Sequence, residues 1–181
     1  DVDGVTLSER TDSGLSSARR LTIELSQGDF RVQPAKPGEP LRFEADFDEG
    51  RFDLVSTHKV ISPGRERFEF SFKRKRGGIF GILDEILGPQ SHNQLRLYLP
   101  ADEPMALDLE LLQGNGELEL GGLPIEKLEY DAGMGNFELS FSEPNPLPMS
   151  AMLIRQDKGN FELDGLGNAA ASKIDIRCSQ G

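Results

Sequence analysis

The feature that most constrains the fold of this 181-residue chain is a short motif that returns at nearly regular spacing. The stretch GNGEL at residues 114–118 recurs as GNFEL at residues 135–139 and again at residues 159–163. The first glycines of these copies lie 21 and 24 residues apart. A period of this length is typical of folds in which small, similar units stack on one another. We therefore expect a repeat architecture.

Looser copies extend the pattern towards the N-terminus. GDFRV at residues 28–32 and GRFDL at residues 50–54 keep the glycine, the phenylalanine and the closing aliphatic residue, and their glycines lie 22 residues apart. The residues that lead into a glycine also correspond in LTIELSQG (21–28), LDLELLQG (107–114) and KIDIRCSQG (173–181). We expect a single β-repeat domain over residues 1–181, and we expect the native chain to continue past Gly181.

Alternation of apolar and polar residues predicts short strands within each unit. Leu107, Leu109 and Leu111 share one face of a strand and Asp108 and Glu110 the other, because residues two apart point the same way. Glycine-asparagine pairs also favour hairpin turns, so a meander of hairpins is one alternative. The regular spacing favours the other alternative, an all-β single-domain β-solenoid or β-roll with stacked corners.

Three asparagines and three glutamates recur at equivalent positions of the repeat. They are Asn115, Asn136 and Asn160, and Glu117, Glu138 and Glu162. We interpret the asparagines as stacked corner amides rather than the wall of a binding groove. We interpret the glutamates as a solvated outer face rather than a calcium site, because calcium ligands must converge on one point. The repeat therefore predicts no metal site and no cofactor site.

The repeat is interrupted at residues 73–90, KRKRGGIFGILDEILGPQ. A basic tetrad precedes apolar residues at the i, i+3, i+4, i+7 spacing of a short amphipathic helix, which Gly88 and Pro89 end. Such a helix could cover a sheet face or an open solenoid end, and this interpretation is favoured. The alternative is weak contact with an anionic membrane surface or a partner. The candidate contact residues are Lys73, Arg74, Lys75, Arg76, Ile79, Phe80, Ile82, Leu83, Ile86 and Leu87.

Composition excludes several classes of protein. The net charge of −11 opposes binding to nucleic acid phosphates. The single cysteine, Cys178, allows neither an intrachain disulfide nor a cysteine metal cluster, and we expect it to be a half-buried strand residue. No apolar run is long enough to span a bilayer. The chain begins without methionine, as a mature exported chain would.

Candidate catalytic residues are sparse. His58 and His92 lie far apart in the sequence and beside no nucleophile, so surface or strand-end positions are expected for both. No nucleotide-binding or hydrolase motif occurs. Carboxylates are abundant, so a carbohydrate-active β-helix lyase or hydrolase with its carboxylates on a sheet face is the alternative function. The lack of tryptophan and the presence of only two tyrosines weaken this alternative, because sugar rings stack on aromatic residues.

The motifs GNGELELGGL, GMGNFELSF and KGNFELDGL, with SARRLTIELSQGDFRVQP and LRFEADFDEGRFDLV near the N-terminus, resemble the toast-rack domains of bacterial cell-envelope proteins. These include the "putative adhesin" and cell-wall-active antibiotic response families, whose functions are undefined. The resemblance implies an exported or membrane-tethered β-solenoid without catalytic residues. We therefore expect a non-enzymatic, extracytoplasmic binding, adhesion or scaffold domain, at the periplasm or cell surface, whose partner is another envelope protein or a polysaccharide.

Overall fold

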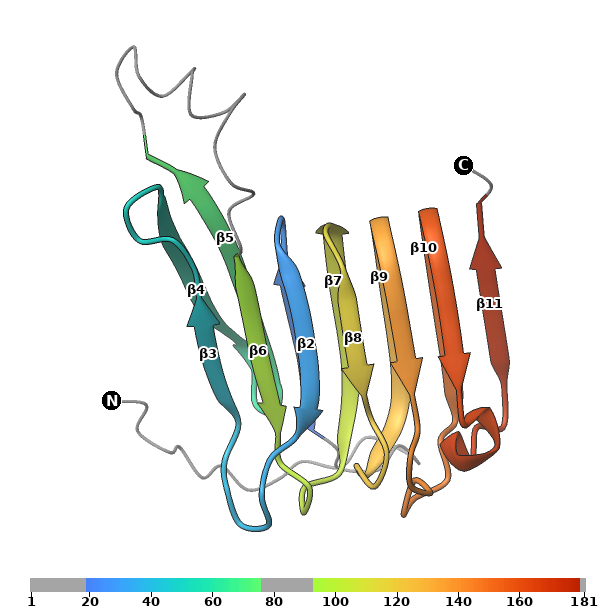
Figure 1. Cartoon of the computed structure of the whole chain (residues 1–181). Helices are drawn as coiled ribbons and strands as arrows, with labels where there is room; N and C mark the ends of the chain where they lie inside the picture. The colour runs from blue at the N-terminus through green and yellow to red at the C-terminus, as the bar shows by residue number, and fades with distance from the viewer. Residues whose placement is uncertain (1–18, 76–92, 180–181) are drawn as a thin grey trace.

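The computed structural model describes residues 19–75 and 93–179, which are mostly β-strands (Figure 1). The strands are β1 (Arg19–Leu25), β2 (Asp29–Pro34), β3 (Arg42–Asp46), β4 (Phe52–Ser62), β5 (Arg65–Arg74), β6 (Gln94–Leu99), β7 (Met105–Gln113), β8 (Gly116–Glu119), β9 (Ile125–Ser140), β10 (Ala151–Asp164) and β11 (Ile174–Cys178). A short 3₁₀ helix, η1 (Leu166–Ala169), precedes β11. The all-β prediction is confirmed, whereas the expected amphipathic helix lies outside the described residues.

The described strands join one hydrogen-bonded network that folds back on itself, so that its two halves face each other across the core (Figure 1). Sheet 1 contains, in spatial order, β4, β5, β1, β7, the first halves of β9 and β10, and β11. Sheet 2 contains β3, β6, β2, β8 and the second halves of β9 and β10. The chain reverses between the sheets, so the repeated strands of sheet 1 run opposite to those of sheet 2.

Neighbouring repeat strands are parallel within each sheet. β1 pairs with β5 on one side and with β7 on the other, while β2 lies between β6 and β8 in the same way. This stacking is that of a solenoid and not of a meander of hairpins. The order of the stack differs from the order of the chain, because the strands of residues 19–34 lie between those of residues 65–99 and those of residues 105–119.

The prediction that the motif at residues 50–54 forms a solenoid corner is wrong. Gly50 lies in the turn between β3 and β4, and these two strands run antiparallel to β6 and β5. The backbone N–H of Gly50 donates a 2.9 Å hydrogen bond to Asp48 Oδ1, and the Arg51 guanidinium lies 3.3 Å from Asp48 Oδ2. These local bonds close a tight turn, so the chain returns in the opposite direction at this end of the stack.

The core follows the predicted alternation. Leu107, Leu109 and Leu111 are fully buried between the sheets, whereas Asp108 and Glu110 lie on the outer face of sheet 1. Corresponding apolar residues of the other repeat strands join the same hydrophobic cluster. We call one strand of sheet 1 together with the strand of sheet 2 that follows it a level of the stack. Each level therefore buries its apolar face against its neighbours, as stacked repeats require.

Glycines form the corners between the sheets. Gly28, Gly114, Gly135 and Gly159 all have positive φ and stack directly on one another. A Cβ on Gly135 would lie 1.6 Å from the carbonyl oxygen of Gly114, so no other residue fits. The predicted repeat glycine is thus explained by both its backbone conformation and the close approach of the level beside it.

Candidate functional site

A trough of about 960 Å³ lies on the outer face of sheet 2. It begins at Gln94 of β6 and crosses β2, β8 and the second halves of β9 and β10, perpendicular to the strands. Two rows of polar side chains line it. The amide row is Asp29, Asn115, Asn136 and Asn160, and the acidic row is Glu117, Glu138 and Glu162, with Arg31 at its end.

The amide row is a continuous ladder of hydrogen bonds. Asn115 Nδ2 donates to Asp29 Oδ1 at 3.0 Å, and Asn136 Nδ2 donates to Asn115 Oδ1 at 3.2 Å. Asn160 Nδ2 continues the series with a 3.0 Å bond to Asn136 Oδ1. The predicted stack of corner amides is confirmed. The ladder also forms one wall of the trough, a role that the sequence interpretation had set aside.

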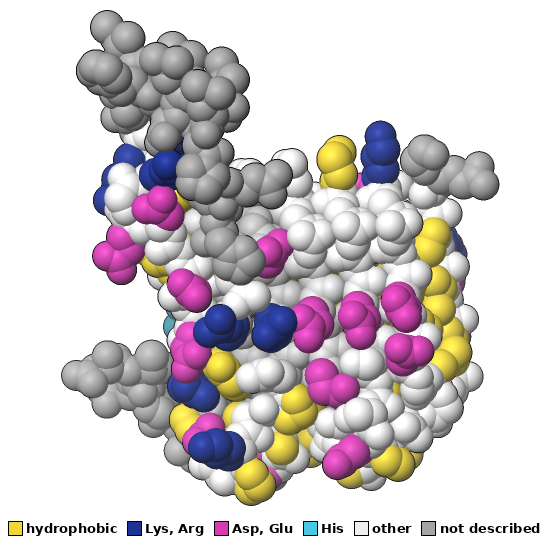
Figure 2. Space-filling model, in the orientation of Figure 1, with side chains coloured by type: hydrophobic (Ala, Val, Ile, Leu, Met, Phe, Trp, Pro, Cys, Tyr) yellow, Lys and Arg dark blue, Asp and Glu magenta, His cyan; other side chains and the backbone are white. Residues whose placement is uncertain are grey.

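The acidic row is in register across the strands. Glu117 pairs with Glu138 and Glu138 with Glu162, while Arg31 occupies the equivalent position on β2. Arg31 Nη2 lies 2.5 Å from Glu117 Oε2. The exposed Glu138 and Glu162 make no ion pair with another described residue. Figure 2 shows the resulting line of acidic side chains, with basic side chains beside it.

The repeat motif indicates the positions of Asp29 and Arg31, the two members of the trough rows that were not predicted. Aligning GDFRV at residues 28–32 with GNGEL at residues 114–118 places Asp29 at the asparagine position and Arg31 at the glutamate position. The repeat thus predicts which surface rows these residues join. It does not predict a hollow, because the hollow exists only once strands from distant parts of the chain lie side by side.

A second carboxylate cluster lies on the outer face of sheet 1. Burial raises the pKa of Asp108, and the nearby carboxylates of Glu129 and Asp131 raise it further, while Arg20 and Arg67 partly offset the shift. The hollow at Asp108 is only about 10 Å³, which is the space of one water molecule. This hollow is far smaller than the trough across sheet 2.

Within the described residues, no group of three or more histidine, cysteine, aspartate or glutamate side chains is arranged to hold a metal ion. Those residues likewise contain no helix with the length and hydrophobicity needed to cross a membrane. The trough therefore offers hydrogen-bond donors and acceptors from rows of amides and carboxylates, with one guanidinium, as its binding chemistry.

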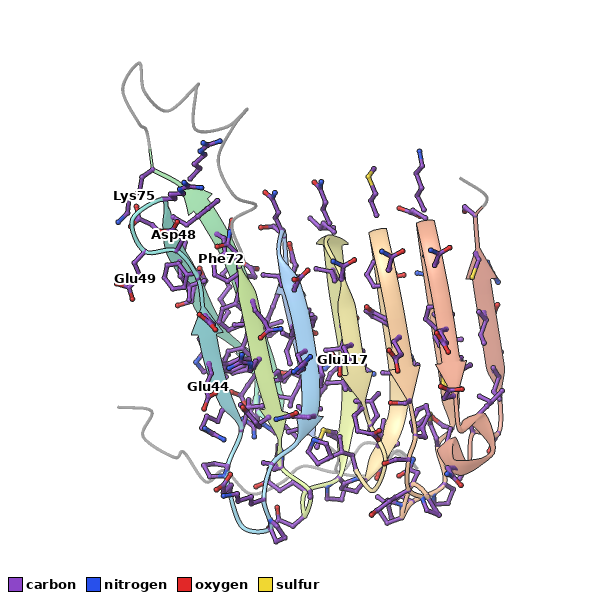
Figure 3. The ribbon with its side chains drawn as sticks, in the orientation of Figure 1. Glu44, Asp48, Glu49, Phe72, Lys75 and Glu117 are labelled. Carbon is purple, nitrogen blue, oxygen red and sulfur yellow. The ribbon has the colours of Figure 1, made fainter. Side chains whose placement is uncertain are left out.

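Only the first three residues of the predicted contact segment lie in the described part. Lys73 and Arg74 end β5, and Lys75 follows them. Lys75 Nζ donates a 2.7 Å hydrogen bond to the carbonyl oxygen of Glu49 and lies 3.3 Å from Asp53 Oδ1. Figure 3 shows Lys75 beside Asp48 and Glu49 at one end of the stack, away from Glu117 in the trough. The contact role stays a prediction, because Arg76 and the apolar residues from Ile79 to Leu87 are not described.

Two other sequence expectations concern titratable residues. His58 lies on β4 near its turn to β5, as expected, where its ring stacks on Phe68 and its Nε2 lies 2.8 Å from Glu66 Oε2. His92 lies outside the described residues. Cys178 is exposed rather than half-buried, because β11 is the last described strand of sheet 1 and no described strand covers its outer edge.

No known protein family matches the sequence, and neither does any curated protein. Among solved structures, the crystal structure of a "putative cell adhesion protein" from Clostridium sporogenes ATCC 15579 is similar, with a TM-score of 0.48 and 10% sequence identity. The similarity covers 91% of this chain and 94% of that chain. At that identity and score it assigns neither a family nor a function. The toast-rack resemblance and the placement in the cell envelope stay predictions.

Proposed function

We propose that this protein is a non-enzymatic binding domain that holds a linear polysaccharide, neutral or amino-bearing, in the trough across sheet 2. The observation that carries the proposal is the pair of in-register rows, because amides and carboxylates repeat together on β8, β9 and β10. A hollow of about 960 Å³ lies at the upper end of the range for ligand sites.

The spacing of the rows suits a polymer of sugars. Neighbouring strands lie about 4.8 Å apart, so equivalent side chains recur at that interval across the sheet. This interval is close to the length of one hexose unit in an extended chain. A polysaccharide that crosses the strands would therefore place each sugar beside one amide and one carboxylate, and the hydrogen bonds would add with each level.

The charge of the trough selects among polysaccharides. Glu138 and Glu162 form no ion pair with a described residue, and Arg31 is held by Glu117. The chain as a whole carries a net charge of −11. Both features repel a polyanion and favour a neutral or amino-bearing polymer.

Isothermal titration calorimetry with chitin oligosaccharides of increasing length, acetylated and deacetylated, tests the proposal. We expect affinity to rise with length up to about four sugars, one for each residue of the amide row, and alginate to bind much more weakly. Equal affinity for all lengths, or no binding of either oligosaccharide series, would contradict the proposal.

A charge reversal in the trough, matched with one outside it, locates the binding site. Glu138→Lys removes a carboxylate from the middle level and should weaken binding of the deacetylated series by at least about tenfold. Asp102→Lys makes the same change in an exposed turn between β6 and β7 and should leave binding unchanged. Equal losses in the two variants would indicate a general charge effect rather than a site.

The same oligosaccharides distinguish binding from the alternative function, hydrolysis. Adjacent glutamates of the acidic row are one strand spacing apart, which is near the separation of the two carboxylates in retaining glycosidases. Both Glu138 and Glu162 are exposed, whereas a catalytic acid needs a sheltered setting. We expect the oligosaccharides to stay intact, and release of new reducing ends would favour the enzyme.

A polysaccharide ligand also supports the proposed location in the cell envelope, which fractionation of the source cells would test.

A further inference from the structure

The amide row of the trough has a fixed hydrogen-bond direction. Asp29 is the first member of the row, and a carboxylate can only accept hydrogen bonds. Its Oδ1 accepts from the backbone N–H of Asn115 at 3.3 Å and from Nδ2 of Asn115 at 3.0 Å. Asn115 therefore turns its Nδ2 towards Asp29 and its Oδ1 towards Asn136, which adopts the same orientation in turn. Asp29 thus sets the orientation of the amides that follow it.

This orientation makes the amide row a row of donors. Asn115 Oδ1 accepts from the backbone N–H of Asn136 at 3.3 Å and from its Nδ2 at 3.2 Å, so both lone pairs of this oxygen are used. Each Nδ2 carries two hydrogens, and the ladder uses one of them. The second hydrogen of Asn115 and that of Asn136 have no acceptor among the described residues. A ligand that lies against this row therefore meets N–H groups.

The acidic row has the opposite chemistry. Ionised carboxylates accept hydrogen bonds and donate none. At the β2 side of the row, Arg31 compensates Glu117, with Nη2 2.5 Å from Oε2. Glu138 makes no hydrogen bond or ion pair with a described residue, and its neighbours in register are Glu117 and Glu162. The row therefore presents uncompensated negative charge at Glu138.

The two rows face a ligand from opposite sides of the trough. Asn136 and Glu138 lie two residues apart on the same outer face of β9, and Asn115 and Glu117 are placed in the same way beside them. Two residues of a strand span about 7 Å. Each unit of a polymer that crosses the strands therefore has one edge against N–H donors and the other edge against carboxylates.

We propose that the polysaccharide in the trough is an amino-sugar polymer with its free amino groups along one edge and neutral acceptors along the other. This inference rests on the proposed function and adds a ligand class and an orientation to it. The ammonium groups pair with Glu138 and its neighbours, and carbonyl and ring oxygens accept from the amide row. A site built around a polar group discriminates strongly against ligands that lack this group, because its own polar side chains are then left unpaired.

In a β-1,4-linked chain, this preference becomes a preference for one order of sugars. Successive sugars of such a chain face opposite ways, so their C2 substituents point to the two edges in alternation. An acetamido group suits the edge at the amide row, and a free ammonium suits the edge at the acidic row. A chain in which acetylated and free amino sugars alternate therefore satisfies both rows. A fully deacetylated chain directs half of its ammonium groups at N–H donors, and a fully acetylated chain leaves Glu138 without a cation.

Two β-1,4-linked glucosamine tetrasaccharides of equal composition and charge test this preference. One alternates acetylated and free amino sugars, whereas the other has its two acetylated sugars first. Isothermal titration calorimetry at mildly acidic pH, where sugar amines carry a proton, should give the alternating isomer an affinity at least about tenfold higher. Equal affinities, or tighter binding of the block isomer, would overturn this inference and leave the proposed function intact. Binding of the fully acetylated tetrasaccharide alone would do the same, whereas binding of none of the three would contradict the proposed function as well.

Glu138→Gln separates the charge of the acidic row from its shape. Glutamine has nearly the size of glutamate but carries no charge, so circular dichroism should be unchanged. We expect the variant to bind the alternating isomer about tenfold more weakly and the fully acetylated tetrasaccharide with unchanged affinity. Asp102→Asn makes the same loss of charge in the exposed turn between β6 and β7 and should change neither affinity. An undiminished preference for the alternating isomer in Glu138→Gln would also overturn the inference.

Discussion

At the scale of single residues, the described core contains a buried hydroxyl, that of Tyr130, without a hydrogen bond. Tyr130 is fully buried, and its hydroxyl makes no hydrogen bond to a described residue. Burial raises the pKa of this hydroxyl far above its usual range, so it stays neutral. It lies against Gly116, where an added Cβ would be 2.5 Å from the hydroxyl oxygen and 3.0 Å from the ring of Phe137. The missing side chain at Gly116 therefore provides the space for Tyr130.

This arrangement predicts a specific coupling between two substitutions. Tyr130→Phe should leave stability unchanged or raise it by up to about 1 kcal/mol, because it removes a buried, unbonded hydroxyl. Gly116→Ala should cost about 1 to 3 kcal/mol through overpacking. In the double variant, part of that cost should disappear, since the hydroxyl that the new methyl group meets is gone. Urea unfolding of the four proteins measures the coupling. A large loss in Tyr130→Phe alone would show that the hydroxyl has a bonding partner.

At the scale of elements, the glycine corners are the least replaceable parts of the repeat. Gly135 combines a φ of 151° with a carbonyl oxygen 1.6 Å from the position of an added Cβ. We expect Gly135→Ala to destabilise the fold by about 3 kcal/mol or more, because both the backbone conformation and the stacking of two levels must change. Thermal unfolding followed by circular dichroism is a sufficient measurement.

Two other glycines serve as controls for the corner. Gly167 has no atom within 4 Å of an added Cβ and no positive φ, so Gly167→Ala should be nearly neutral. Gly38 has a φ of 79° but open space around it, and Gly38→Ala should cost about 1 to 2 kcal/mol from backbone conformation alone. Similar losses at Gly135 and Gly38 would mean that the close approach of neighbouring levels contributes little.

The same elements show what the sequence could and could not predict. Alternation at residues 107–111 predicted the buried face, and the recurring asparagines predicted the amide ladder, because both patterns are local and repeat in every level. The motif at residues 50–54 misled, since a tight antiparallel turn and a solenoid corner both favour glycine. Only Asp48, two residues before Gly50 and bonded to its N–H, indicates the turn.

The order of the stack could not be predicted either, and for a related reason. Each repeat strand presents alternating apolar residues to the core, so its pattern fits beside almost any other copy. The sequence therefore contained no local signal that residues 19–34 would enter between two later segments. The trough was missed for the same reason: the rows were evident from the repeat, but a hollow beside them exists only once the strands are stacked.

At the scale of the whole molecule, the central place of residues 19–34 in the stack makes β1 and β2 the connection between two halves. In the described structure, all strand pairing between β3 to β6 and β7 to β11 passes through β1 and β2. A repeat protein stacked in chain order could lose its first unit and keep the others. Here, loss of β1 and β2 would separate the stack in the middle, so local fraying of these strands should be strongly coupled to global unfolding.

Leu21→Ala tests this coupling. Leu21 lies on β1 between β5 and β7 and is fully buried, so truncation should cost about 2 to 5 kcal/mol. Because β5 and β6 are connected to β7–β11 only through β1 and β2, hydrogen exchange should accelerate in β5 and β6 as much as in β1. Leu54→Ala, at a half-buried position on β4 at one end of the strand order, should cost less and leave exchange in β7 and β9 unchanged. Faster exchange confined to β1 in Leu21→Ala would show instead that the two halves of the stack hold together without their central strands.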